Sequence, residues 1–243
     1  MLKKILSIFM VGIMVFTLTG CDDSSDTDKD NPNTTDDDTN TEVPAVDRPF
    51  TESEGLIRYL TIEGVQVAIP ETVGEYVKYL EEVGTKVEII PNPNKEDEVA
   101  SLGDTLAAND QSSVKAYLKV YNEDGEYHKF GLHYINNTDE DITVSEASID
   151  KLILYYDMRS ADGQVDPETP ELYLIDTITC VTDFGDIVLD NDTKSKYIVS
   201  IIGNPNQNTD GFFTYNDESG FVYKLATSNQ QGILTQVDIT YPK

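Results

Sequence analysis

An abrupt change from apolar to acidic residues confines the folded part of this 243-residue chain to the residues that follow it. The 14 residues Ile5 to Leu18 are nearly all apolar and come after two lysines. Residues 22–47 hold nine Asp, one Glu and one Lys, with no apolar periodicity. The apolar run is shorter than the roughly 20 residues that a bilayer-spanning helix needs. We therefore expect a removable signal peptide over residues 1–20 and an acidic, disordered tether over residues 21–47.

The junction between these two segments, Leu18-Thr19-Gly20-Cys21, resembles the bacterial lipobox. This resemblance implies that the leader is cut before Cys21 and that the sulfur of Cys21 carries a diacyl lipid anchor. The alternative is an ordinary secretory leader followed by a chance cysteine. A lipobox implies a lipoprotein held at the cell membrane, on its extracytoplasmic face.

Composition excludes two classes of protein. The chain has 45 acidic and 17 basic residues, a formal net charge of −28, which becomes −30 once Lys3 and Lys4 leave with the signal peptide. Ordinary nucleic-acid binding needs a basic surface that displaces counterions, so no nucleic-acid partner is expected. Two cysteines in all exclude a scaffold stapled by several disulfides.

The first half of the globular part alternates apolar runs with turn residues. Val65, Val67 and Ile69 alternate with other residues and predict a strand that stops at Pro70. Thr72 and Glu75 form a capping-box pattern, which predicts the start of a helix. A short helix is possible near Val99 to Leu106. Further strands are predicted over residues 86–90, 114–121, 127–135 and 149–156.

The second half repeats this order after a polar connector over residues 162–170. Strands are predicted over 171–181 and from 185 to 189. A helix capped by Asp192 or Thr193 follows, with Tyr197, Ile198, Ile201 and Ile202 on its buried side and Gly203 at its end. Three more strands are predicted over 212–215, 220–227 and 232–241.

This repeated layout predicts an α+β fold made of two tandem modules, an N-terminal one over residues 48–160 and a C-terminal one over residues 168–243. Each module would pack one helix on an antiparallel β-sheet. The rival arrangement is a single continuous sheet that runs through both halves, in which case separating the halves exposes an unpaired edge.

Two short patterns resemble known families. The segments Val67-Ala68-Ile69-Pro70 and Ile202-Gly203-Asn204-Pro205 look like modules of lipoproteins from Gram-positive gut bacteria. The second pattern, with the aromatic strand at Phe212-Phe213-Thr214-Tyr215, is similar to the beta-lactamase inhibitor protein fold and to the small lipoprotein of the outer-membrane barrel-assembly machinery. The resemblance implies a helix-on-sheet fold that binds proteins, and it supplies no catalytic residues.

The histidines and Cys180, residue types that often act in metal or catalytic sites, form no recognisable site in the sequence. His128 and His133 lie five residues apart on one predicted strand, so they point to opposite faces and cannot form a metal pair. Cys180 lies between Thr179 and Val181 and reads as a small core residue. No catalytic residue, metal or cofactor is assigned.

The acidic segment from Asp157 to Glu168 invites comparison with a calcium-binding loop. On that template its third position is Arg159 and its sixth is Asp162 instead of glycine, so the match fails. A solvated acidic connector is the preferred interpretation.

Function is therefore expected to be non-enzymatic binding of a protein or cell-wall partner by a membrane-anchored lipoprotein. Exposed Tyr117 and Tyr121, with Tyr155 and Tyr156, would provide an adhesive face, although tyrosines on the second face of a sheet are more often covered by a helix or loop. The alternative is a cell-wall or glycan-active enzyme that uses a carboxylate pair. With 45 acids in the chain, the sequence selects no such pair.

The lipid anchor gives a direct prediction. Substitution Cys21→Ala should move the protein from the membrane fraction to the soluble fraction, because only a thiol can form the thioether to the lipid. A fatty-acid probe fed to cells should label the wild type and leave the variant unlabelled. Equal labelling of the two would contradict the lipoprotein interpretation.

Overall fold

The structure, a computed structural model, describes residues 51–108, 112–155, 175, 177–189, 193–209, 211–227 and 232–243. These residues belong to one unit of the chain, Glu42–Lys243. The expected signal peptide, tether and calcium-loop comparison segment lie outside the described residues, as does Cys21.

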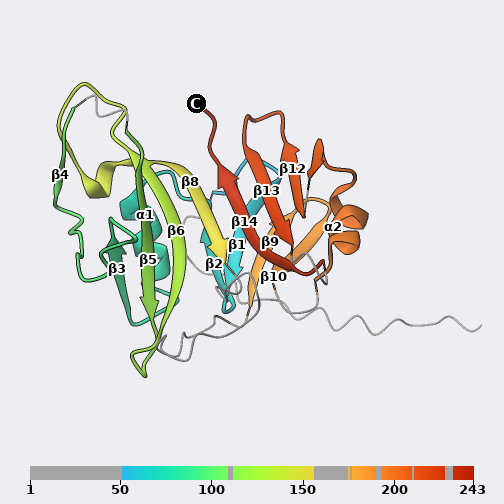
Figure 1. The fold of residues 1–243 in the computed structure, drawn as a ribbon, viewed down its shortest axis with the longest axis horizontal. Helices are drawn as coiled ribbons and strands as arrows, with labels where there is room; N and C mark the ends of the chain where they lie inside the picture. Colours follow the sequence, from blue (N-terminus) through green and yellow to red (C-terminus); the bar gives the residue numbers. More distant parts are fainter. Residues whose placement is uncertain are drawn as a thin grey trace, which may run out of the picture. The chain divides into compact units, whose positions relative to one another are not determined.

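Eight antiparallel strands form the main sheet, in the order β11-β12-β13-β14-β8-β6-β5-β3. Their bounds are β3 (Lys86–Ile90), β5 (Val114–Tyr121), β6 (Tyr127–Ile135), β8 (Ser148–Tyr155), β11 (Gln207–Thr209), β12 (Phe212–Asn216), β13 (Val222–Thr227) and β14 (Leu234–Thr240). This sheet faces the viewer in Figure 1.

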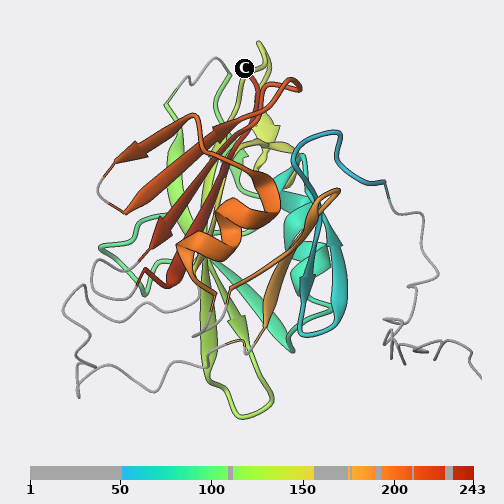
Figure 2. The same ribbon diagram turned by 90° about the vertical axis from the view of Figure 1, so that its right-hand side faces the viewer.

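A smaller sheet and the helices lie on the other side of the main sheet (Figures 1 and 2). The smaller sheet has the order β10-β9-β1-β2, and a separate two-stranded ladder joins β4 to β7. Their bounds are β1 (Ile57–Ile62), β2 (Val65–Ala68), β9 (Ile178–Thr182), β10 (Gly185–Leu189), β4 (Thr105–Leu106) and β7 (Ile142–Thr143). The helical elements of the described residues are α1 (Val73–Leu80), α2 (Ser195–Ile202) and the 3₁₀ turn η1 (Val144–Glu146).

The expected α+β fold of two tandem modules is wrong. Strand β8 from the first half pairs with β14 from the second, with Leu152 opposite Ile239 and Leu154 opposite Val237. The smaller sheet is mixed in the same way, because β1 pairs with β9 and places Leu60 opposite Cys180. The fold is mostly β, and the rival arrangement of one sheet running through both halves is the one observed.

One hydrophobic core lies between the layers and draws on both halves of the sequence. The main sheet turns alternate side chains inward, among them Leu118, Phe130, Leu152 and Ile239, all fully buried. Helix α1 packs on this face, where the ring of Tyr76 meets that of Phe130 edge-on at 6.3 Å. The smaller sheet adds residues such as Leu60 and Cys180 to the same core.

The two helices differ in how well local sequence signals specified them. The predicted capping box of α1 is confirmed, because Glu75 N–H donates to Thr72 Oγ1 and the Glu75 carboxylate accepts from Thr72 N–H. Helix α2 begins after Lys194, which makes no side-chain cap, so the predicted cap at Thr193 is wrong. Its predicted buried side is also wrong in part, because Tyr197 is 50% exposed and Ile198 is the buried residue of this helix. No helix within the described ranges is long and apolar enough to cross a membrane.

The segment near residues 99–106 is not helical. It forms turns and the two-residue strand β4, which pairs with β7. Strand β1, for which no prediction was made, is the centre of the smaller sheet beside β9 and β2.

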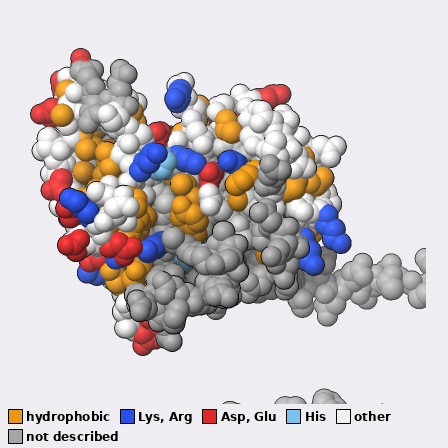
Figure 3. All heavy atoms as spheres, in the orientation of Figure 1, with side chains coloured by type: hydrophobic (Ala, Val, Ile, Leu, Met, Phe, Trp, Pro, Cys, Tyr) orange, Lys and Arg blue, Asp and Glu red, His pale blue; other side chains and the backbone are white. Residues whose placement is uncertain are grey.

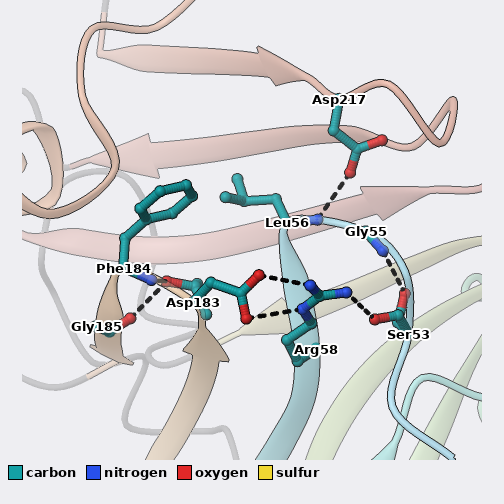
Figure 4. A network of polar contacts seen from close by, with 9 residues as sticks. Ser53, Gly55, Leu56, Arg58, Asp183, Phe184, Gly185 and Asp217 are labelled. Atoms are coloured by element: carbon teal, nitrogen blue, oxygen red, sulfur yellow. Dashed lines mark hydrogen bonds and ion pairs between the residues drawn. The ribbon is translucent and has the colours of Figure 1, made fainter.

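A polar network also links distant parts of the chain (Figure 4). The Arg58 guanidinium on β1 donates to both carboxylate oxygens of Asp183, at 3.0 and 2.5 Å, and to the carbonyl of Ser53 at 2.8 Å. Leu56 N–H donates to the Asp217 carboxylate at 2.8 Å, across 161 residues of sequence. Bidentate arginine–carboxylate geometry fixes orientation as well as position. The start of the described chain is therefore held to the C-terminal strands.

Shared sheets predict that the two halves do not fold alone. Fragments 48–160 and 168–243, expressed separately, should each give collapsed amide signals in NMR, because β8, β14, β1 and β9 all lose a partner strand. Mixing the two fragments should recover dispersion. Two well-dispersed spectra from the separate fragments would contradict this prediction.

Candidate functional site

The outer face of the main sheet, the one turned away from the core, gathers positive charge in a chain that is otherwise strongly acidic. Strand registers place six lysines on this outer face: Lys86, Lys115, Lys119, Lys129, Lys151 and Lys224. Figure 3 shows blue side chains across the middle of this face, with a pale-blue histidine between them. Because the whole chain has 17 Lys and Arg, more than a third of its basic residues lie on one surface.

Aromatic rings separate these lysines. The Lys119 ammonium lies 4.6 Å from the ring centre of Tyr127, and Lys129 lies 4.8 Å from that of Tyr117. At the far end of the sheet, Lys224 lies 4.0 Å from the ring centre of Phe212. An ammonium over an aromatic face is attracted by the negative centre of the ring. The lysines are thus held in fixed positions on the outer face.

A single carboxylate bridges the two central lysines. Lys119 and Lys129 lie directly opposite each other on β5 and β6, an arrangement in which like charges repel. Glu96, from the segment after β3, places one oxygen 2.9 Å from Lys129 and the other 3.3 Å from Lys119. This bridge gives Lys119, which is only 8% exposed, a carboxylate partner. Burial alone would raise the pKa of Glu96, but the two lysines and Tyr117 hold it below its usual value.

A second ion pair lies at the edge of the sheet. Glu88 on β3 accepts from Lys86 at 2.5 Å and from the Tyr121 hydroxyl at 2.6 Å. These two donors lower the pKa of Glu88, while burial and the Glu88 carboxylate raise that of Tyr121. Glu88 is therefore ionised and Tyr121 protonated across the neutral pH range.

A row of three basic side chains crosses the centre of the outer face. Lys115 on β5 lies opposite His133 on β6, and His133 lies opposite Lys151 on β8. Lys151 is paired with Asp238 on β14 at 2.6 Å. Lys115 is exposed, and no described residue forms an ion pair with it.

Desolvation is the main cause that lowers the pKa of His133 below its ordinary value. Asp150 opposes this effect, Lys151 and Lys115 add to it, and Asp238 opposes it weakly. The imidazole is therefore neutral at pH 7 in the free protein.

The structure decides several of the residue-level predictions. His128 is buried and His133 half-buried on opposite faces of β6, so the prediction that they do not converge is confirmed. Cys180 is fully buried in the core, where burial, with a smaller effect of Asp186, raises the pKa of its thiol to about 12. The core interpretation of Cys180 is therefore confirmed.

The predicted tyrosine face exists in part. Tyr117, Tyr121 and Tyr155 share the outer face, whereas Tyr156 lies outside the described residues. Tyr117 is buried beside Glu96, and Tyr121 and Tyr155 are half-buried. The exposed part of the face is therefore formed by lysine more than by tyrosine. The sequence signal that could have shown this is the alternation of Lys115 and Lys119 with core residues along one strand.

The carboxylates with a clearly shifted pKa do not resemble a general acid. Each one whose pKa departs clearly from its ordinary value has it lowered, namely Glu88, Glu96, Glu146 and Asp183. A general acid that works at neutral pH needs a raised pKa. In the part of the chain that the structure describes, no three His, Cys, Asp or Glu side chains gather as a metal site.

Comparison with known proteins gives no relative: no protein-family model, curated protein or solved structure matches this chain. The site is therefore interpreted from its own geometry.

The Glu96 bridge predicts an effect on stability. Glu96→Gln should lower the free energy of unfolding by about 0.5–1 kcal/mol, because it removes the carboxylate that pairs with both Lys119 and Lys129, which lie directly opposite each other. Urea denaturation of the full chain measures this loss. The matched control is Glu98→Gln, which breaks only the exposed Lys95–Glu98 pair and should lie within about 0.3 kcal/mol of wild type. Equal losses in the two variants would contradict the special role of the bridge.

Proposed function

We propose that this protein is a lipid-anchored extracytoplasmic binding protein, without catalytic activity, and that the outer face of the main sheet is its ligand-binding surface. The anchor is the acylated Cys21 of the lipobox-like segment. The ligand is carried by a protein or by a cell-wall component. The single observation that supports the binding surface is the concentration of six lysines on one face of a chain with a net charge of −28.

The clustering of lysines on the outer face is better explained by ligand binding than by a contribution to folding stability. Exposed ion pairs contribute little to folding, and like charges directly opposite on neighbouring strands destabilise a sheet. The core on the inner face needs no charge on the outer face. Clustered lysines beside aromatic rings give a negatively charged partner a surface of opposite charge. The rigid sheet also holds these groups in place before the ligand arrives.

The alternative function is a cell-wall or glycan-active enzyme with a carboxylate pair. Glu88 and Glu96, the acids of the outer face that lie nearest its tyrosines, are both engaged by lysines and both have a lowered pKa. They are suited to hold lysines in place rather than to donate protons. Binding is therefore the function that we favour.

Retention of envelope material by the purified full chain tests this proposal. Lys115→Glu, on the exposed part of the outer face, should reduce retention of the native ligand at least about fivefold, since it reverses a charge at the binding surface. Lys196→Glu, an equally exposed lysine on α2, makes the same charge change elsewhere and should leave retention unchanged.

Two outcomes would contradict the proposal. Equal loss in both variants would show that net charge, and not the outer face, controls retention. Release of cleaved glycan products by the wild type, abolished by one Asp or Glu substitution, would establish the enzyme instead.

A further inference from the structure

The Glu96 carboxylate between Lys119 and Lys129 shows how two opposite basic residues of this sheet hold an anion. We use this arrangement as the template for a second site. Lys119 and Lys129 are opposite residues of β5 and β6, and Lys115 and His133 are opposite residues of the same two strands, four positions away on each. An even displacement in an antiparallel pair preserves both the face and the type of pair. The two pairs therefore present their side chains to the outer surface in the same way.

The two pairs differ in their counter-charge. The carboxylate of Glu96 lies between Lys119 and Lys129 at 3.3 and 2.9 Å. Among the described residues, no carboxylate forms an ion pair with Lys115 or His133, and Asp150 acts on His133 only through its charge. Lys151 extends this second pair to a row of three, with each member directly opposite the next.

We propose that Lys115, His133 and Lys151 bind an oxyanion of the ligand, a phosphate or sulfate ester or a carboxylate, in the place that Glu96 takes between Lys119 and Lys129. This inference rests on the proposed function and names the ligand chemistry of the same surface. The oxyanion accepts from the Lys115 ammonium, from the His133 imidazolium and from the Lys151 ammonium. His133 takes up a proton from solvent as the anion binds, because the anion favours the charged form of the ring.

Surrounding acids limit the size of the anion. Asp238 pairs with Lys151, and Asp150 acts on His133 from the same strand as Lys151, so the row has little excess positive charge. The turns that flank β5 and β6 are acidic: Glu123, Asp124 and Glu126 lie at one end, and Asp139, Glu140 and Asp141 at the other. An extended polyanion would approach these carboxylates and be repelled. A ligand with one localised anionic group fits this surface.

NMR titration of His133 in the purified full chain tests the site. Sulfate, whose charge does not change between pH 5 and 8, should shift the imidazole signals saturably and raise the His133 pKa by about one unit. Acetate, added at pH values well above the pKa of acetic acid so that it is fully ionised, tests the carboxylate arm. Sodium chloride at matched ionic strength measures the effect of screening alone. A tetrahedral oxyanion ligand is indicated if sulfate binds more tightly than acetate, and a carboxylate ligand if the order is reversed.

Single substitutions test which residues bind the anion. Lys115→Gln and Lys151→Gln should each weaken sulfate binding at least about fivefold, and Lys196→Gln should not change it. Glu96→Ala removes the side chain between Lys119 and Lys129 and should create a second sulfate site, reported by the ring signals of Tyr117 and Tyr127. If chloride reproduces every shift of sulfate, or if neither the row nor the emptied template binds sulfate, the inference is overturned. Loss of envelope retention in Lys115→Glu alongside that result would leave the binding surface supported and the oxyanion rejected.

Discussion

Five residue pairs between β8 and β14, from Lys151 opposite Thr240 to Tyr155 opposite Gln236, join strands from both halves of the sequence in the middle of one sheet. Without this pairing, both strands would be sheet edges, and their unpaired backbone groups would need other partners. The same pairing brings Lys151 next to Asp238 and completes the outer face. The inner face, with Leu152 and Ile239, depends on it equally. The core and the proposed binding surface therefore both depend on the pairing of β8 with β14.

The two faces of the main sheet have different roles. The inner face buries apolar side chains from β5, β6, β8 and the C-terminal strands against α1 and the smaller sheet. The outer face carries lysines whose mutual repulsion is partly relieved by Glu88, Glu96 and Asp238. Because strands alternate their side chains, one short segment supplies both faces at once. A protein can thus keep a fixed core while its outer residues determine what it binds.

The proposed anchor and the proposed surface support a common interpretation. A protein held at a membrane meets its ligand at a high effective concentration, so modest affinity at a small site suffices. Because His133 is neutral and lies between two lysines, anion binding at such a site depends on pH. The ring takes up a proton when the anion binds. The acidic remainder of the surface repels extended polyanions from the same lysines.

Local sequence signals predicted much of the secondary structure but not the fold. Alternating residues identified β5, the turn after it identified β6 as its hairpin partner, and the capping box of Thr72 and Glu75 identified the start of α1. These signals work because neighbouring residues alone decide strand alternation and helix capping. The predicted cap and buried face of helix α2 were partly wrong, because its packing against strand β10 of the smaller sheet has no local signature in the sequence.

The sequence by itself determined the opposite orientation of His128 and His133, the core character of Cys180 and the existence of most strands, since each follows from spacing along one element. Only the tertiary structure decided that β8 pairs with β14 and β1 with β9, and hence that two expected modules share their sheets. It also decided which lysines become neighbours. Lys115, His133 and Lys151 are far apart in sequence, and they meet only because backbone hydrogen bonds between separate strands fix the register in which their side chains face one another.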